Sequence, residues 1–350
     1  MTEVEVKASG NYKVIIGDGL IKNIGNYIKD FLNPIKTVII TDDIVDSLYS
    51  QTVENSLKNS GFEVLKYVIE NGEKSKNGQN FLKICEFLAE NHITKSDLII
   101  ALGGGVVGDL AGFVSASYLR SIKFIQVPTT LLAAVDSSVG GKTAIDIKSG
   151  KNLVGAFYQP KLVLCDYSTL STLKPEIFTD GCAEVIKYAV IGNKELFNHL
   201  LEKGKNFDLE YVISECIKMK RDIVEKDEFD SGERQKLNLG HTIGHSVELC
   251  SNFEISHGSA VAIGLAIIAR ASAKKGLCSN ICAEKIVEIL EKFELPTKTN
   301  ISSEELYKPA LSDKKRSGNS LNLVIPYDIG DSRLLKTNVS DLITYIEAGI

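Results

Sequence analysis

The first half of the chain alternates short apolar runs with helical segments, and this alternation constrains the fold more than any other feature. We predict strands at residues 36–40, 62–69, 98–102, 123–127 and 161–165, with helices between them that include 79–90 and 109–117. Residues 4–16 alternate polar and apolar side chains around Ser9-Gly10-Asn11, which predicts a hairpin. Strands that alternate with helices predict a mostly parallel, Rossmann-like sheet covered on both faces. Ligands of such sheets bind beyond the carboxyl ends of the strands.

The pattern changes after Pro175, where helical periodicity replaces the strands. We predict helices at residues 177–190, 194–201, 209–224, 236–249, 259–275 and 283–293, and a short strand at 321–325. The predicted fold class is therefore an α/β N-terminal domain followed by a mostly α-helical C-terminal domain. We place the division between residues 1–170 and 171–350.

Composition limits the classes of function. A hydrophobic content of 44% is ample for a core, and a net charge of −5 argues against a nucleic-acid surface. The seven cysteines are an odd number in mostly apolar surroundings, which indicates reduced thiols in the cytoplasm. We expect no signal peptide, because the N-terminus lacks a basic start and an apolar stretch. We also expect no membrane partner, because no apolar run reaches the ~20 residues that span a bilayer.

Glycine and lysine clusters after the predicted strands favour a phosphorylated ligand. Gly103, Gly105 and Gly108 fit G-x-G-x-x-G between a strand and a helix. The acidic residue expected about 20 residues later is missing, so a phosphate loop and a purely structural turn both stay open. Residues 136–143 contain Gly-Gly-Lys-Thr outside the P-loop frame, and Lys151-Asn152 follows. Lysines in such polar loops bind phosphate as point charges, or are simply solvated.

Three of the five histidines gather in the helical half. His241 and His245 are four residues apart and share a helix face, His257 precedes the next helix, and Glu184 lies upstream. Two or three histidines with a carboxylate are the ligand set of catalytic Zn²⁺. A packed histidine pair is the commoner reason for this spacing. Spacing does not decide which histidines would bind a metal, and His241 with His245 is the simplest choice.

Basic and amide side chains accompany this group. Lys187 lies three residues after Glu184, and Arg234 and Asn238 precede His241 at intervals of about one helical turn. Arginine is the preferred partner of a carboxylate because its fork binds two oxygens. Lys220 and the Lys314-Lys315 pair are further candidates, although each of these charges taken singly reads as solvated surface. Sharing a helix face with the metal candidate makes Arg234 and Asn238 the better candidates.

In these and further segments the chain resembles the 3-dehydroquinate synthase family. The matching segments run in order over nearly the whole chain: Gly72-Glu73-Lys74-Ser75-Lys76, 103–120, Pro128-Thr129-Thr130, 136–143, 183–188, 237–242 and His257-Gly258. The resemblance implies the dehydroquinate synthase-like fold and a zinc- and NAD-dependent carbon–oxygen lyase of the shikimate pathway, with Co²⁺ as an alternative metal. Such an enzyme converts 3-deoxy-D-arabino-heptulosonate 7-phosphate to 3-dehydroquinate and phosphate by transient oxidation at C5, phosphate elimination, re-reduction and aldol closure.

The resemblance also implies roles for individual residues. It assigns the metal to Glu184, His241 and His257. This replaces the simplest choice of metal-binding histidines, which was His241 with His245. It assigns NAD to Asp42, Asn71, Gly72, Glu73, Lys74, Ser75, Lys76, Gly105, Val106, Val107, Gly108, Asp109, Thr129, Thr130, Lys142, Lys151, Thr169, Leu170, Ser171 and Thr172. It assigns the substrate to Asp136, Lys142, Asn152, Lys187, Lys220, Arg234, Asn238, His245 and one lysine of the Lys314-Lys315 pair. Family homodimers place an arginine near the phosphate of the neighbouring subunit, and Arg120 matches it.

Three positions depart from the family pattern, and three rival functions compete with it. Ile44 replaces an asparagine, Asp230 replaces a glutamate, and Ser259 replaces the glutamate of His-Gly-Glu-Ala. One rival is another sugar-phosphate cyclase such as 2-deoxy-scyllo-inosose synthase, whose substrate lacks the carboxylate. The second is an NAD-dependent polyol dehydrogenase, which would consume NAD stoichiometrically. The third is a non-catalytic binding protein that has kept the fold.

Overall fold

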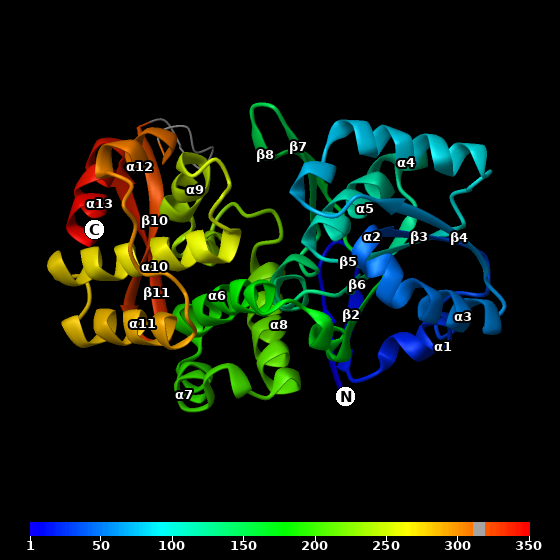
Figure 1. Ribbon diagram of the computed structural model, residues 1–350, viewed down its shortest axis with the longest axis horizontal. Helices are drawn as coiled ribbons and strands as arrows, with labels where there is room; N and C mark the ends of the chain where they lie inside the picture. The colour runs from blue at the N-terminus through cyan, green and yellow to red at the C-terminus, as the bar shows by residue number, and fades with distance from the viewer. Residues whose placement is uncertain (311–318) are drawn as a thin grey trace. The chain divides into compact units, whose positions relative to one another are not determined.

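The computed structural model of this 350-residue chain describes residues 1–310 and 319–350. The chain forms two compact units (Figure 1). The first contains Met1–Leu173 and Leu209–Phe229, and the second contains Lys174–Asp208 and Asp230–Ile350. Helix α8 (Leu209–Lys226) therefore packs with the first unit, although it follows two helices of the second.

The first unit is built on a seven-stranded sheet in the order β1-β2-β9-β6-β5-β3-β4. Its strands are β1 (Thr2–Val6), β2 (Tyr12–Gly17), β3 (Lys36–Asp42), β4 (Glu63–Ile69), β5 (Leu98–Gly103), β6 (Lys123–Pro128) and β9 (Leu162–Asp166). Strands β1 and β2 form the predicted antiparallel hairpin, and every other pairing in this sheet is parallel. The predicted strands and their mostly parallel sheet are confirmed.

Continuous apolar runs form these strands because both faces of the sheet are buried. Ile39 packs on one face, with helices α1 (Ile24–Lys29) and α3 (Gln51–Asn59). Val38 and Ile40 pack on the other, with α4 (Gly78–Glu90) and α5 (Gly105–Ser117). Helices α4 and α5 lie on the opposite side of the sheet from α1 and α3 (Figure 1). Alternate side chains of a strand point to opposite faces, so one apolar strand serves two cores. Each fully buried Val, Leu or Ile contributes about 1.5–3 kcal/mol.

Two strands of the first unit lie where the sequence predicted polar loops. β7 (Lys142–Ile147) and β8 (Gly150–Phe157) pair antiparallel as a separate two-stranded sheet. Lys142, Lys151 and Asn152 therefore lie on strands, and the loop prediction for them is wrong. A Cβ at Gly155 would lie 2.1 Å from the Thr143 carbonyl oxygen, so glycine permits the close approach of the two strands.

The second unit is mostly helical. Its helices are α6 (Pro175–Gly192), α7 (Lys194–Lys203), α9 (His241–Cys250), α10 (His257–Lys274), α11 (Asn280–Lys292), α12 (Ser303–Ala310) and α13 (Leu342–Gly349). Strands β10 (Ser320–Asp328) and β11 (Asp331–Asn338) form an antiparallel pair. The sequence predicted α6, α7, α9, α10, α11 and β10, but missed α12, α13 and β11, of which the two helices have only eight residues each.

Helix α10 forms the centre of this unit. Residues 260–269 are buried on every side of the helix, because α6, α9, α11 and α13 pack around it. A helix that is apolar all round is stable only inside such a bundle. None of the helices in the described part of the chain is both long enough and apolar enough to cross a membrane.

The predicted helix 236–249 is interrupted at Gly240. A 3₁₀ turn covers Glu233–Asn238, and α9 begins only at His241. Gly240 has φ +78°, and a Cβ there would lie 2.9 Å from both the Val261 carbonyl oxygen and the Leu265 nitrogen of α10. Glycine adopts this left-handed conformation at little cost and lets the chain touch α10. The prediction that Arg234 and Asn238 share a helix with His241 is therefore wrong.

Candidate active site

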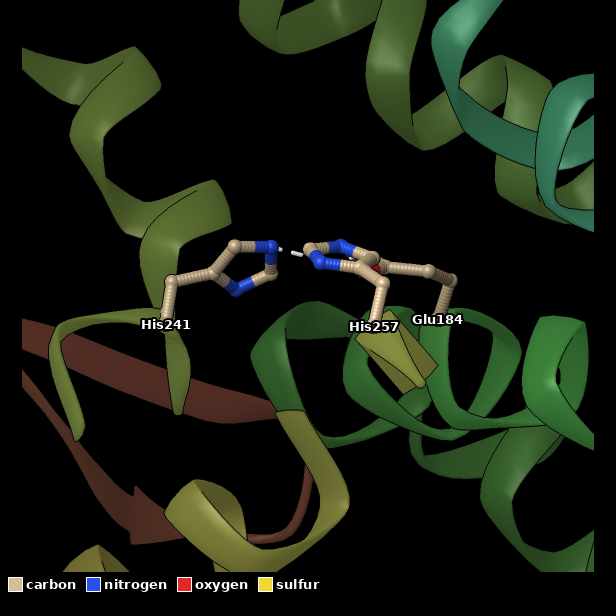
Figure 2. A group of neighbouring side chains, drawn as sticks. All are labelled: Glu184, His241 and His257. Atoms are coloured by element: carbon tan, nitrogen blue, oxygen red, sulfur yellow. Dashed lines mark ion pairs between the residues drawn. The ribbon is translucent and has the colours of Figure 1, made fainter. Parts of the chain in front are cut away.

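Three helices of the second unit bring together a carboxylate and two imidazoles. Glu184 lies in the middle of α6, and His241 and His257 begin α9 and α10 (Figure 2). Nε2 of each histidine lies 3.3 Å from Oε1 of Glu184. The ligand-type atoms of the three residues all lie within 4.8 Å of one another, so this group could hold a metal ion.

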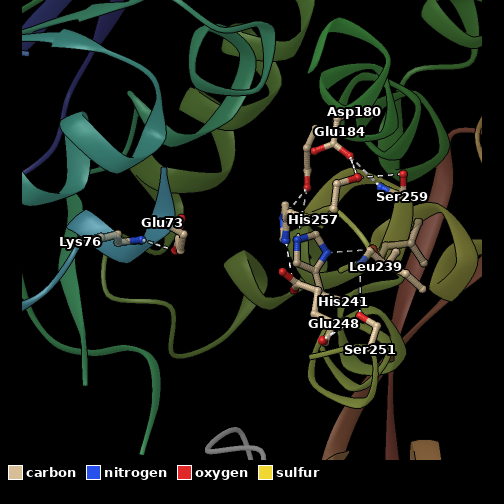
Figure 3. Close-up of polar contacts among 12 residues, drawn as sticks. Glu73, Lys76, Asp180, Glu184, Leu239, His241, Glu248, Ser251, His257 and Ser259 are labelled. Atoms are coloured by element: carbon tan, nitrogen blue, oxygen red, sulfur yellow. Dashed lines mark hydrogen bonds and ion pairs between the residues drawn. The ribbon is translucent and has the colours of Figure 1, made fainter. Parts of the chain in front are cut away.

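The far side of each imidazole is held by a hydrogen-bond acceptor. His241 Nδ1 lies 3.2 Å from the Leu239 carbonyl oxygen, and His257 Nδ1 lies 3.3 Å from Oε2 of Glu248 (Figure 3). These acceptors favour a proton on Nδ1, so Nε2, which faces Glu184, is the nitrogen available to a metal. A carboxylate or carbonyl behind a metal-binding histidine is the usual way of orienting it. The sequence carried a signal for Glu248, which follows His241 by seven residues on the same helix face, but no role was predicted for it.

The charges in the group suit a cation. Glu184 is fully buried, and its carboxylate faces the Lys187 ammonium at Oε2 and the two imidazoles at Oε1. Burial raises the pKa of Glu184, but the adjacent Lys187 ammonium helps to outweigh it and hold that pKa well below its usual range. Burial lowers the pKa of His241, which keeps its imidazole neutral. A buried anionic carboxylate beside two oriented imidazoles is a donor set that fits Zn²⁺.

His257 carries a proton when no metal is bound. Burial lowers its pKa, but Glu184 and Glu248 outweigh burial and raise the pKa to about 10. A metal ligand must be a neutral imidazole, so metal binding would release this proton. Without a metal, protonated His257 supplies positive charge to the carboxylates of Glu184 and Glu248. A bound metal would supply positive charge there instead.

His245 lies beside this group and not in it. Its ring centroid is 5.4 Å from that of His241 and 6.2 Å from that of His257. Among the described residues it belongs to a second ligand-type group, with Glu248 and His257. Neither group pairs His241 with His245, and only the first includes a fully buried carboxylate. The geometry therefore favours Glu184, His241 and His257 over the pair four residues apart.

The predicted carboxylate-binding residues lie just before α9. Arg234 is in the 3₁₀ turn Glu233–Asn238 with only 1% of its surface exposed. Asn238 ends this turn, and its Nδ2 donates to the Gln235 carbonyl oxygen at 3.0 Å. Lys187 forms an ion pair with Glu184 across one turn of α6, as their spacing predicted. Lys314 and Lys315 lie outside the described residues.

The first unit brings two other predicted substrate residues together. Lys220 of α8 contacts both the carboxylate and the carbonyl oxygen of Asp136. Asn152 has φ +54°, and its backbone nitrogen donates to Asp146 at 2.8 Å. Arg120 is exposed and also has a positive φ, +62°. Positive φ is uncommon outside glycine, so the backbone at Asn152 and Arg120 is held by its surroundings.

Most of the residues assigned to NAD follow the carboxyl ends of parallel strands, whereas Lys142 and Lys151 lie on the hairpin of β7 and β8. Asp42 ends β3, and its carboxylate caps the next helix by accepting from the nitrogens of Ile44 and Val45. Asn71 follows β4 and is held by Asp43, which accepts from its backbone at 2.9 Å and from its side chain at 3.0 Å. The others occupy the turn Glu73–Ser75, the start of α5, residues 129 and 130 after β6, and the turn Tyr167–Thr172 after β9.

The glycine pattern has a structural cause at two of its positions. A Cβ at Gly103 would lie 2.7 Å from a side-chain atom of Val107. A Cβ at Gly108 would lie 2.7 Å from Oε1 of Gln126. These glycines let α5 pack closely on the sheet. At Gly104 and Gly105 the helix begins without a side-chain cap, which leaves its first N–H groups for an anion. The glycine segment can therefore serve both as a structural turn and as a phosphate-binding loop.

A buried ion pair joins two of the segments assigned to NAD. Lys76 Nζ lies 2.8 Å from Asp109 Oδ2, and the two side chains are 5% and 18% exposed. Burial lowers the pKa of Lys76, but Asp109 and Glu73 outweigh it and raise that pKa. Burial raises the pKa of Asp109, and the adjacent Lys76 ammonium opposes that rise. The pair ties the loop after β4 to the first turns of α5.

Removing one member of this pair is expected to destabilise the first unit. In Lys76→Met the Asp109 carboxylate would stay buried without its main cation, and the free energy of unfolding should fall by about 3 kcal/mol. The double variant Lys76→Met/Asp109→Asn should recover much of the loss, because no buried charge remains. Chemical denaturation of the three proteins measures both effects. A double variant that is less stable than Lys76→Met would contradict this explanation.

Comparison with known proteins identifies the family. The model of the 3-dehydroquinate synthase N-terminal domain matches residues 66–180, and that of the 3-dehydroquinate synthase C-terminal domain matches residues 181–316. The chain belongs to the 3-dehydroquinate synthase family. It is 44% identical to the 3-dehydroquinate synthase of Clostridium acetobutylicum, with 99% of each chain covered. It is 42% identical to that of Enterococcus faecalis strain OG1RF, with 97% of each covered.

Solved structures of related folds agree with this membership. A 2-deoxy-scyllo-inosose synthase complexed with carbaglucose-6-phosphate, NAD⁺ and Co²⁺ superposes with a TM-score of 0.89 over 100% of both chains, at 25% identity. A glycerol dehydrogenase from Schizosaccharomyces pombe shares the fold, with a TM-score of 0.67 over 96% of this chain and 88% of its own, at 16% identity. The dehydroquinate synthase-like fold predicted from the sequence is confirmed.

Proposed function

We propose that this protein is a 3-dehydroquinate synthase, which converts 3-deoxy-D-arabino-heptulosonate 7-phosphate to 3-dehydroquinate and phosphate in the shikimate pathway. The observation that carries the proposal is the group of Glu184, His241 and His257, in a chain that matches both family domains. Its full-length relatives at 42–44% identity bear this name. The rival cyclase of similar fold is only 25% identical.

The cofactors are NAD and Zn²⁺, with Co²⁺ as an alternative metal. Glu184, His241 and His257 would hold the metal, which when bound polarises the substrate oxygen at C5 as a Lewis acid. The residues at the strand ends of the first unit would hold NAD, which would supply reversible hydride transfer at C5 without net oxidation. The protein's own contribution is to bind, orient and shield one molecule through several steps.

Several side chains would give the substrate its orientation. Arg234 and Asn238 would bind the carboxylate, because the guanidinium fork matches two oxygens and the amide donates a further hydrogen bond. Lys142, Asn152, His245 and Arg120 would bind the phosphate and hydroxyl groups as donors or positive charges. Lys187 and Lys220 already carry carboxylate partners, Glu184 and Asp136, so they would hold those acids in place as well as contact the substrate.

Three further proposals concern the setting of the reaction. We infer that the protein works in the cytoplasm, because its seven cysteines indicate a reducing compartment. A homodimer would let Arg120, which is exposed here, reach the phosphate of a neighbouring subunit. Residues 1–170 and 171–350 would then act as the NAD-binding and the metal- and substrate-binding domains.

Phosphate release tests the proposed reaction directly. With 3-deoxy-D-arabino-heptulosonate 7-phosphate and a trace of NAD, we expect many turnovers per NAD, because the hydride returns to the product. Treatment with a chelator should stop the release, and added Zn²⁺ or Co²⁺ should restore it. The measurement is inorganic phosphate together with absorbance of NADH.

The same assay separates the rivals. NADH that accumulates in step with product would point to a polyol dehydrogenase. Cyclisation of glucose 6-phosphate, with no phosphate released from the heptulosonate, would point to 2-deoxy-scyllo-inosose synthase. No turnover of any of these substrates by the metal-loaded protein would favour a binding protein that has kept the fold.

A further inference from the structure

Helix α10 begins without a cap from its own chain segment. Its N-cap residue is Ser256, so His257, Gly258 and Ser259 are the first three residues of the helix. The Ser256 side chain accepts no hydrogen bond from the first turn, which is the usual function of a serine at this position. The backbone donors of this turn therefore need another partner.

That partner is Asp180, which comes from a different helix. Its Oδ1 accepts a hydrogen bond from the backbone nitrogen of Ser259 at 2.9 Å, the bond that an N-cap side chain would ordinarily accept (Figure 3). The Ser256 hydroxyl also donates to Asp180 Oδ1, and it lies 2.9 Å from the Ser259 hydroxyl. Asp180 thus caps α10 from outside, with a negative charge at the positive end of the helix dipole.

The two helices also touch through their backbones at this point. A Cβ at Gly258 would lie 2.0 Å from the Asp180 carbonyl oxygen, so only glycine fits between α6 and the first turn of α10. Gly258 is the residue next to His257. The position of the His257 backbone is therefore fixed against α6 by contacts on its C-terminal side, and by Ser256 on its N-terminal side.

Asp180 lies one turn before Glu184 on the same helix. One short segment of α6 therefore supplies both the carboxylate of the metal group and the anchor of the helix that carries His257. His257 Nε2 lies 3.3 Å from Glu184 Oε1, and this spacing depends on how α10 is seated on α6. Glu248 orients the ring of His257 through Nδ1, whereas Asp180 places its backbone.

We propose that Asp180 is a positioning residue for the metal site, which sets the distance between His257 and Glu184 by capping α10 from α6. This inference rests on the proposed function, because it assumes a metal at Glu184, His241 and His257. Asp180 is not one of the ligand-type residues of the metal group. Loss of an outer partner of a metal ligand typically weakens metal binding 10–100-fold.

The test measures metal affinity and not turnover. Zn²⁺ is titrated into chelator-treated full-length protein in competition with a chromophoric chelator, and the visible absorption of bound Co²⁺ reports the geometry of the site. Asp180→Ala should bind Zn²⁺ about 10-fold more weakly and change the Co²⁺ spectrum. Asp180→Asn keeps an acceptor oxygen and should show a smaller loss, which preserves the test if the alanine variant does not fold.

A second-site rescue and a matched control make the test specific. Ser259→Glu in the Asp180→Ala protein would create a Ser-x-x-Glu capping box with Ser256, and should restore much of the affinity. Ser279→Ala removes the cap of α11, where Ser279 accepts from the Cys282 nitrogen at 3.1 Å, in the same unit. This control should lose some stability and keep the metal affinity of the original protein. A purely structural role for Asp180 predicts that both cap variants behave alike.

The outcomes are distinguishable. If Glu184→Gln loses the metal while Asp180→Ala binds it as the unchanged protein does, the inference about Asp180 is wrong and the proposed metal site stands. If the unchanged protein binds neither Zn²⁺ nor Co²⁺, both the metal site and the inference are wrong. The positioning role is supported by three results together. Asp180→Ala binds the metal more weakly, Ser259→Glu restores the affinity of that variant, and Ser279→Ala keeps the affinity of the original protein.

Discussion

Glu184→Gln is expected to abolish metal binding and to reduce turnover by at least about 10³-fold, which corresponds to ~4 kcal/mol of lost transition-state stabilisation. Glutamine keeps the shape of the side chain and removes its charge, so the two histidines would be left without an anionic ligand. Glu184 is the central member of the group, because both imidazoles approach the same carboxylate oxygen at 3.3 Å. Metal content after dialysis and phosphate release from the substrate measure the two effects.

The same substitution should also lower stability. Lys187 is buried against Glu184, so Glu184→Gln would remove the anionic side of a buried ion pair at a cost of about 3–5 kcal/mol. Added Zn²⁺ rescues a protein only through a site that binds it, so excess metal should raise the melting temperature of the original protein but not of Glu184→Gln.

Glu202→Gln is the matched control for this experiment. Glu202 lies on α7 of the same unit and pairs with Lys203 at the surface, with 70% of its side chain exposed. An exposed pair contributes little, so this variant should keep its metal, its turnover and its stability. Full metal content in Glu184→Gln would show that the metal is held elsewhere.

The sheet could be predicted from the sequence because its physical cause is local. Strands buried on both faces need continuous apolar residues, so residues 98–102 read as a strand without any knowledge of their neighbours. The hairpin of β7 and β8 could not, because its glycines and lysines have the composition of a loop. Gly155 becomes intelligible only when the Thr143 carbonyl oxygen is seen, because a Cβ at position 155 would lie 2.1 Å from it.

The metal group shows the same division between local and long-range information. Spacing along the chain favoured His241 with His245, because sequence distance is the only distance that a single helix reveals. In the structure, His257 comes from another helix and approaches Glu184, while His245 stays one turn away. Only the family resemblance selected Glu184, His241 and His257, and the roles of these residues stay predictions until metal binding is measured.

Gly240 explains why the surroundings of Arg234 were predicted wrongly. The periodicity of residues 236–249 is helical, but it contains no information about α10, which requires glycine at a positive φ. The chain therefore changes direction between Asn238 and His241. Arg234 ends up in a separate 3₁₀ turn, where its guanidinium is buried.

Arg234→Ala is expected to reduce kcat/KM by about 10²–10⁴-fold and to leave the metal content unchanged. Hydrogen bonds between charged groups contribute about 1.5–3 kcal/mol each, and the fork of an arginine makes two of them with one carboxylate. Arg234 lies on the turn that precedes α9 and is not one of the ligand-type residues of the metal group. Phosphate release and metal content, measured on the same samples, separate its role from that of Glu184.

Two comparisons show whether the carboxylate is the partner of Arg234. Arg234→Lys keeps the charge but not the fork, so its kcat/KM should lie between those of Arg234→Ala and the original protein. With a substrate analogue that lacks the carboxylate, the original protein and Arg234→Ala should differ much less, because the interaction is missing from both. Arg333→Ala, at an arginine of β11 with 53% of its side chain exposed, should behave as the original protein does with both compounds.

The buried position of Arg234 makes the result informative. Only 1% of the surface of Arg234 is exposed. An arginine this deeply buried normally has a partner or a function, because removing its charge from water is costly. If Arg234 were only structural, Arg234→Ala would lower the melting temperature and reduce turnover of both compounds by the same factor. Selective loss with the carboxylate-bearing substrate is the result that the carboxylate role requires, and normal turnover in Arg234→Ala would refute it.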